Sequence, residues 1–156
     1  EVGKKAEGMK LFEKVVMATV SQPLNIKRIR NEIIDLLSLE LKEESDIGRA
    51  QRLSERLRKG TTLLILDDVW EKLNFEALGI PFDESCKTCC VLLTTRNREI
   101  CNFMQCQSII ELDLLTSDEA WILFRKYANI TDISSEALKE GVARKIINEC
   151  KGLPIA

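Results

Sequence analysis

Unbroken apolar runs recur along much of the chain and predict β-strands. An apolar run without polar alternation is typical of a strand that is buried on both faces of a parallel sheet. The runs at 63–66 and 88–96 have this character, and the second becomes polar only at its carboxyl end. The predicted strands are residues 15–20, 63–66, 88–96 and 108–112.

Apolar residues at helical spacing follow the first strand and predict an amphipathic helix over 25–39. Asn25 is its expected N-cap, because a short polar side chain there can accept a hydrogen bond from the first turn. The basic residues Lys27, Arg28 and Arg30 lie off the apolar face. We expect them on a solvated surface rather than in a binding patch.

A second amphipathic helix is predicted over 47–57, with Ile47 on its apolar face. Gly60 follows at a position where a glycine commonly ends a helix. Three shorter helical segments are expected at 1–10, 73–78 and 97–103. Strands and helices therefore alternate up to residue 113, which predicts an α/β domain with a parallel sheet and right-handed crossovers.

The pattern changes from residue 114 onward, where two helices follow without a strand. Thr116 and Glu119 have the spacing of a capping box, which opens the first of these helices. Its apolar face contains Ala120, Trp121, Phe124 and Tyr127. A polar link at 129–135 precedes the last helix, lined by Leu138, Val142, Ala143, Ile146, Ile147 and Cys150 and ended by Gly152. We expect two units, residues 1–113 and 114–156.

Two adjacent aspartates, Asp67 and Asp68, end the central apolar run. Ligands of open α/β sheets bind at the carboxyl ends of the strands, so both are candidate site residues. Neighbouring side chains on an extended chain point to opposite sides, which gives the two carboxylates different tasks. One could hold Mg²⁺ on a nucleotide, and the other could orient or deprotonate a water. Alternatively, the pair only ends the strand and caps a turn.

Arg96 stands at the carboxyl end of the 88–96 run, near Asp67 and Asp68 if the two strands are neighbours. A guanidinium at that edge could bind a terminal phosphate through two hydrogen bonds. The alternative is that Arg96 forms a salt bridge to the same aspartates. If Arg96 is considered by itself, this alternative is slightly favoured.

Composition limits the class of protein, the partners and the catalytic residues that the chain can have. The chain has 156 residues, of which 45% are hydrophobic and 31% charged, so we expect a globular domain. A net charge of −2 gives no reason to expect nucleic acid or an anionic membrane as a partner. No apolar run has the length of a transmembrane helix. The absence of His excludes Ser-His and Cys-His nucleophile pairs.

Three of the six cysteines, Cys86, Cys89 and Cys90, have a spacing that could suggest zinc. However, Cys89 and Cys90 open an apolar run, where Cys behaves as a small hydrophobic residue. The chain offers neither His nor a matched second pair of cysteines. We therefore expect reduced thiols in a cytosolic protein.

Five motifs occur in order: VVMATVSQ at 15–22, LLILDDVW at 63–70, VLLTTR at 91–96, EAWILF at 119–124 and GLPIA at 152–156. Together they resemble the NB-ARC nucleotide-binding domain of plant disease-resistance proteins, and Trp70 resembles their coiled-coil class. The resemblance implies a P-loop NTPase-type parallel sheet of the signal-transducing ATPase class. It also implies that the sheet lacks its first strand here and is followed by the start of a small helical subdomain similar to ARC1.

The function that the resemblance implies is a cytoplasmic immune receptor with weak Mg²⁺-dependent ATPase activity, used as a switch. ADP would hold the closed state, and exchange for ATP would open a state that forms homo-oligomers. By motif match, Asp67 would bind Mg²⁺ and Asp68 would orient water. Arg96 would sense the terminal phosphate, and Pro154 would pack near the adenine. The implied partners are the nucleotide and the flanking coiled-coil and leucine-rich-repeat domains.

One family motif is absent from the sequence. A phosphate-binding loop of the form G-x-x-x-x-G-K-[ST] should precede the first helix, and Gly3-Lys4-Lys5 does not match it. We therefore expect a fragment of a longer receptor, inactive by itself. The absent strand would bury about five apolar side chains, worth on the order of 7–15 kcal/mol, so the fragment alone should be unstable or molten.

Two other function classes stay open. A conventional P-loop ATPase or kinase would also use Asp67 and Asp68, although the helix at 119–124 followed by Gly-Leu-Pro favours a switch. A nucleotide-free interaction scaffold, or the product of a degenerate gene, would explain the absent phosphate-binding loop.

Overall fold

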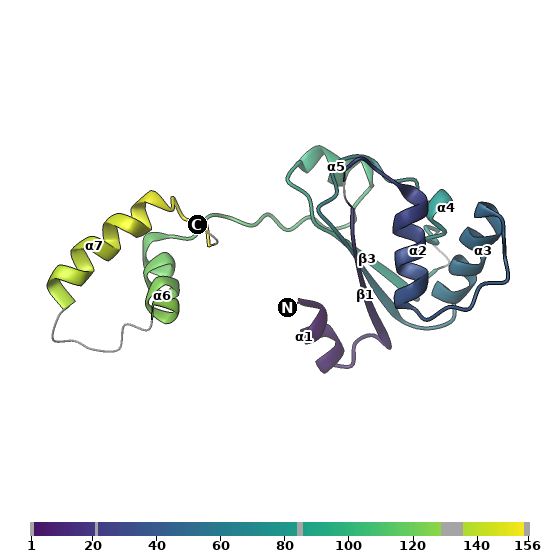
Figure 1. The fold of residues 1–156 in the computed structure, drawn as a ribbon, viewed down its shortest axis with the longest axis horizontal. Coiled ribbons are helices and arrows are strands. Elements are labelled where there is room, and N and C mark those ends of the chain that lie inside the picture. The colour runs from purple at the N-terminus through teal and green to yellow at the C-terminus, as the bar shows by residue number, and fades with distance from the viewer. Residues whose placement is uncertain (1, 21, 84–85, 129–135, 155–156) are drawn as a thin grey trace. The chain divides into compact units, whose positions relative to one another are not determined.

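The computed structural model describes residues 2–20, 22–83, 86–128 and 136–154 (Figure 1). The chain divides into two compact units, residues 1–108 and 109–156. The division lies close to residue 113, where the sequence pattern changes. Among the described residues, no helix combines the length and apolar character needed to cross a membrane.

A parallel sheet with the strand order β1-β2-β3 forms the centre of the first unit. β1 (Lys14–Thr19) pairs with β2 (Thr62–Asp67), and β2 pairs with β3 (Cys89–Leu93). The predicted α/β class and the first three predicted strands are therefore confirmed. The apolar residues of the central strand, 63–66, are at most 6% exposed, as an uninterrupted apolar run requires.

β3 is less buried than the sequence predicts. The run at 88–96 was expected to be covered on both faces, but the residues of β3 are half-buried and Cys90 is exposed. Within the described chain β3 pairs with β2 alone, whereas β2 is paired along both edges. Side chains on β3 consequently have fewer neighbours.

The prediction of a strand at 108–112 is wrong. These residues carry no strand in the described structure, and Ile110 and Leu112 are 80% and 90% exposed. A strand is held by its ladder of hydrogen bonds to a neighbour, and no described segment pairs with these residues. A short apolar run alone does not reveal whether such a neighbour exists.

Helices lie on both sides of the sheet (Figure 1). α1 (Val2–Gly8) approaches one face, where a Cβ on Gly3 would lie 3.1 Å from Val15 Cγ1. α2 (Ile26–Leu36) packs on the other face, where alternate residues of β1 point. The core on that face includes Val16, Ala18, Ile29, Ile33, Leu53, Leu57, Leu64 and Leu66.

The predicted start of α2 holds, but the helix ends at Leu36 and not at residue 39. α3 (Asp46–Leu57) covers the predicted segment 47–57, although its apolar face differs from the prediction. Asn25 caps α2 as expected, since its side chain accepts a hydrogen bond of 2.9 Å from Arg28 N. In α3, Ile47 is 74% exposed, because the buried face begins one turn later at Ala50. Gly60 does not terminate α3: the helix ends at Leu57, and Gly60 is not among the residues with a positive φ.

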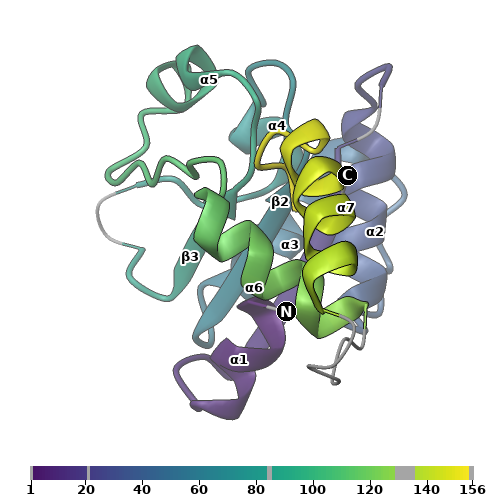
Figure 2. The same cartoon turned by 90° about the vertical axis from the view of Figure 1, so that its left-hand side faces the viewer.

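Two short helices follow β2 and β3. α4 (Phe75–Leu78) ends at Gly79, whose φ of 86° is left-handed. A Cβ on Gly79 would lie 2.3 Å from Ala50 O, so only glycine permits this contact between α4 and α3. α5 (Arg98–Phe103) begins after Asn97, its cap, and Figure 2 shows it beyond the end of the sheet opposite α1.

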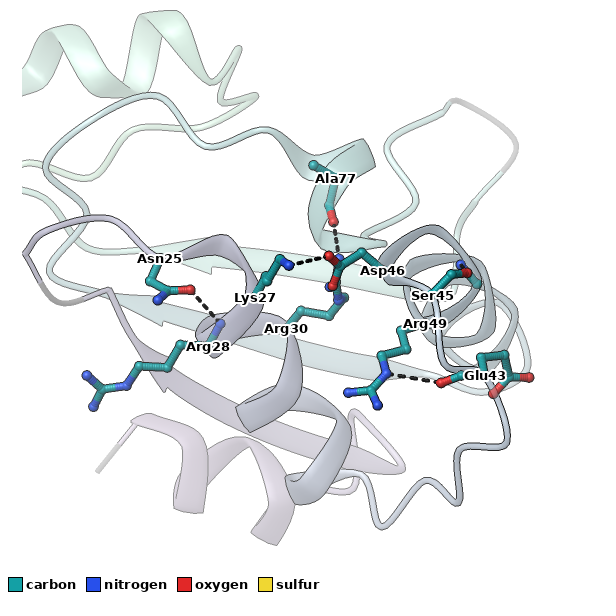
Figure 3. A network of polar contacts seen from close by, with 10 residues as sticks. Asn25, Lys27, Arg28, Arg30, Glu43, Ser45, Asp46, Arg49 and Ala77 are labelled. Atoms are coloured by element: carbon teal, nitrogen blue, oxygen red, sulfur yellow. Dashed lines mark hydrogen bonds and ion pairs between the residues drawn. The ribbon is translucent and has the colours of Figure 1, made fainter.

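Arg30 joins α2, α3 and α4, which corrects the prediction that it lies on a solvated surface (Figure 3). Its side chain is 3% exposed. The guanidinium forms an ion pair with Asp46 at the start of α3 and donates a hydrogen bond of 3.0 Å to Ala77 O in α4. Lys27 supports the same carboxylate at 2.6 Å and remains exposed, as predicted.

The second unit contains α6 (Ser117–Tyr127) and α7 (Glu136–Glu149). The capping box is confirmed: Thr116 N donates to Glu119 Oε2 at 2.9 Å, and Glu119 N donates to Thr116 Oγ1 at 3.3 Å. The Arg144 guanidinium lies 5.2 Å from the centre of the Trp121 ring, which brings α7 against α6.

The apolar face predicted for the last helix is only partly correct. Ala143 and Ile147 are buried, whereas Val142 and Ile146 are 58% and 47% exposed. Tyr127 at the end of α6 is also exposed. Gly152 has a left-handed φ and its carbonyl accepts a hydrogen bond from Leu115 N, so it does turn the chain after α7. The link at 129–135 and the Leu138 side chain lie outside the described residues.

Candidate functional site

Polar side chains meet where β2 and β3 end. Because the two strands are parallel neighbours, their carboxyl ends lie at the same edge of the sheet. Asp67 is the last residue of β2, and Thr94 follows β3 directly. The backbone ladder continues past the strand ends, since Thr94 N donates to Leu66 O and Val69 N donates to Thr94 O.

The Thr94 hydroxyl organises both aspartates. It donates a hydrogen bond of 2.7 Å to Asp67 Oδ1 and accepts one of 2.9 Å from Asp68 N. A hydroxyl has a single proton, so the donation to Asp67 fixes the direction of this bond. The Asp67 carboxylate is therefore held in one orientation at the strand end.

Asp68 leaves the strand rather than continuing it. Its φ is +59°, in the left-handed region that Asp tolerates better than most residues. The premise that both aspartates lie on one extended strand is therefore incorrect. The two carboxylates nevertheless have different partners, because Asp67 contacts Thr94 while the Asp68 carboxylate contacts Arg96.

Arg96 lies beside Asp68, as expected if the strands are neighbours. Its Nε is 3.7 Å from Asp68 Oδ1, and its guanidinium carbon is 5.3 Å from the centre of the Trp70 ring. The Arg96 side chain is 78% exposed and that of Asp68 is 41% exposed. The alternative suggested by the sequence, a salt bridge between these residues, is thus present in the structure, in a long and solvated form.

The oxygen atoms at this edge suit a hard cation such as Mg²⁺ better than zinc. Among the described residues, no group of three or more His, Cys, Asp or Glu side chains could enclose a metal. Mg²⁺ commonly binds through one or two carboxylates and takes its other ligands from phosphates and water. An oriented carboxylate at Asp67 fits that requirement.

Pro154 lies in the second unit, where it lines a cavity of about 350 Å³. The lining is mainly apolar and includes Leu123, Phe124, Ile147 and Pro154. This volume lies within the range of small-molecule sites. All residues that line the cavity belong to the second unit.

Two residues at the edge have no role in the sequence-based account of the site. Thr94 was visible only as a polar residue after an apolar run, and its importance depends on the pairing of β2 with β3. Trp70 supports Arg96 through a cation–π contact that requires the turn at Asp68. Neither the pairing nor the turn can be read from residue type alone.

Comparisons with a family model and with known proteins indicate the same family for this chain. The family model described as the NB-ARC domain matches residues 1–134. The disease resistance proteins RPS5, SUMM2 and UNI of Arabidopsis thaliana are 32%, 34% and 33% identical to this chain. Each match covers 93% of the chain but 17% of the relative. The chain thus spans about a sixth of the length of these proteins.

Proposed function

The chain belongs to the NB-ARC family, and on this basis we propose that it is part of a plant immune receptor that switches between ADP-bound and ATP-bound states. The output would be a change of conformation, accompanied by weak Mg²⁺-dependent ATP hydrolysis. One observation carries the proposal: Asp67, Asp68 and Arg96 meet at the carboxyl edge of a parallel sheet, where nucleotides bind in α/β proteins.

Asp67 is the residue that would hold Mg²⁺. Its carboxylate is oriented by the Thr94 hydroxyl, the kind of supporting hydrogen bond that metal ligands commonly have. When bound, the ion would neutralise charge on the phosphate oxygens. Asp67 and Thr94 would set its position relative to the sheet.

Asp68 would orient the attacking water, and Arg96 would bind the terminal phosphate. Their ion pair is long and exposed, so it contributes little stability and separates at low cost. A terminal phosphate that attracts Arg96 would release the Asp68 carboxylate toward water. Arrival of the phosphate would therefore prepare the catalytic carboxylate, while Trp70 keeps the guanidinium close to the edge.

The helical unit would contribute the contact with the base. The apolar cavity beside Pro154 suits a flat, largely apolar ring such as adenine. The relatives are much longer than this chain, so flanking coiled-coil and leucine-rich-repeat domains belong to the same proposal. A cytoplasmic location and homo-oligomer formation in the ATP state complete it.

Replacement of Asp68 by Ala tests the proposal in the complete receptor. Single-turnover hydrolysis of bound ATP should slow by about 10²-fold or more, because a positioned base typically contributes that much. Bound ATP should accumulate at the expense of ADP. Glu55→Ala is the control, since Glu55 is an exposed residue of α3. Unchanged hydrolysis in Asp68→Ala would show that Asp68 does not orient the water.

A further inference from the structure

An aromatic side chain lies beside Arg96 at the carboxyl edge of the sheet. The guanidinium carbon of Arg96 is over the Trp70 ring, 5.3 Å from its centre. Trp70 is 42% exposed, whereas the preceding residue, Val69, is buried in the hydrophobic core. The indole ring is thus presented at the surface, and a cation–π attraction joins it to the guanidinium.

Hydrogen bonds fix the backbone on both sides of this contact. Val69 N donates to Thr94 O at 2.8 Å, which holds the segment after β2 against the end of β3. Asn97 N donates to Thr95 Oγ1 at 3.1 Å, and Asn97 then caps α5. The indole follows directly after the first of these bonds, and the guanidinium belongs to the residue between Thr95 and Asn97. Both side chains therefore extend from backbone that is already ordered.

The guanidinium has two kinds of partner at this edge. Asp68 offers a carboxylate to its N–H groups, with Oδ1 3.7 Å from Nε, whereas Trp70 attracts its delocalised charge through the face of a ring. A terminal phosphate would bind through the N–H groups, because paired N–H···O bonds are the usual mode between Arg and phosphate. The phosphate therefore competes with Asp68 for Arg96 but does not compete with Trp70.

We propose that Trp70 is a positioning residue that sets the preference of the nucleotide site for ATP over ADP, by holding Arg96 ready for the terminal phosphate. The inference rests on the proposed function, which assigns that phosphate to Arg96. The Arg96 side chain is 78% exposed, and an exposed arginine has many rotamers that binding would have to restrict. The Trp70 ring restricts them in advance. ADP has no γ-phosphate, so its affinity gains nothing from the ring.

The second unit offers a matched control. Trp121 in α6 has the same kind of contact, because the Arg144 guanidinium carbon lies 5.2 Å from the centre of its ring. Trp121→Leu therefore removes an indole and a cation–π contact of similar distance, and it leaves every residue at the edge of the sheet in place.

Competition between two nucleotides in the complete receptor tests the proposal. The protein is equilibrated with Mg²⁺ and a known mixture of ADP and the non-hydrolysable β,γ-imido analogue of ATP, and the bound nucleotides are then released and quantified. The ratio of bound analogue to bound ADP should fall by about 2–5-fold in Trp70→Leu, the size expected of a cation–π contact at an exposed site. Trp70→Tyr keeps an aromatic face and should retain most of the wild-type ratio. Trp121→Leu should leave the ratio unchanged.

A double variant shows whether Trp70 acts through Arg96. Arg96→Gln should lower the ratio by itself, and the addition of Trp70→Leu should lower it no further, since no guanidinium remains. An equal effect of Trp70→Leu with and without Arg96 would overturn the inference, as would an unchanged ratio in Trp70→Leu. A folded wild type that binds neither nucleotide would overturn the proposed function as well, so nucleotide binding by the wild type distinguishes the two failures.

Discussion

Thr94 fixes the orientation of the acidic residues at the carboxyl edge of the sheet. Its hydroxyl uses its single proton for Asp67 and receives the N–H of Asp68, so one side chain fixes both neighbours. A carboxylate held in this way has already lost the freedom that binding a cation would otherwise remove. Thr94 is therefore a positioning residue for the proposed Mg²⁺ site.

Replacement of Thr94 by Val removes the hydroxyl and keeps the shape of the side chain. In the complete receptor, the Mg²⁺ concentration that gives half-maximal ATP hydrolysis should rise by roughly 10–100-fold, the usual effect of losing a supporting hydrogen bond to a metal ligand. Thr94→Ser retains the hydroxyl and should restore the wild-type Mg²⁺ dependence. An unchanged Mg²⁺ requirement in Thr94→Val would remove Thr94 from the account.

Sequence reasoning located the candidate site but not its supporting contacts. Asp67, Asp68 and Arg96 stand out because polar residues interrupt apolar runs at strand ends. The roles of Thr94 and Trp70 depend on strand register and on the left-handed turn at Asp68, which residue types do not specify.

Local sequence signals were sufficient to predict most helices and the three paired strands. Asn25 and Thr116 begin their helices because each forms a capping bond within its own first turn. The prediction failed where partners distant in sequence decide the outcome. Arg30 is buried by α3 and α4, and residues 108–112 have no neighbouring strand in the described chain.

The junction of α2, α3 and α4 should lose stability in acid through Asp46. The hydrogen bond from Lys27 lowers the pKa of Asp46 from its ordinary 3.8, and the charges of Lys27 and Arg30 act in the same direction. A carboxylate with a lowered pKa stabilises the fold above its ordinary pKa, and that contribution disappears as the pH falls through the lowered value. The urea midpoint of wild type should therefore exceed that of Asp46→Asn at neutral pH, and the difference should shrink below about pH 4.

Glu55→Gln is the matched control for this titration. Glu55 forms an exposed pair with Arg52 on the surface of α3, and such pairs contribute little. Its urea midpoint should stay close to that of the wild type at every pH. A difference between wild type and Asp46→Asn that persists unchanged at pH 2 would contradict the role assigned to the Asp46 carboxylate.

The whole chain consists of an α/β unit and a helical unit, and each contains residues to which a role in nucleotide binding is proposed. The edge formed by Asp67, Asp68 and Arg96 would handle the phosphates, and the cavity beside Pro154 would receive the base. Membership of the NB-ARC family, whose model matches residues 1–134, supports a nucleotide-binding role for the complete protein. The central claim is therefore that the complete protein carries a nucleotide.

The nucleotide content of the complete receptor tests this claim most directly. The protein is purified without added nucleotide, its cooperative unfolding is verified, and it is then denatured so that any released nucleotide can be identified by chromatography. The account predicts stoichiometric ADP from the wild type. Absence of ADP and ATP from protein that is demonstrably folded would contradict it and would favour a nucleotide-free scaffold.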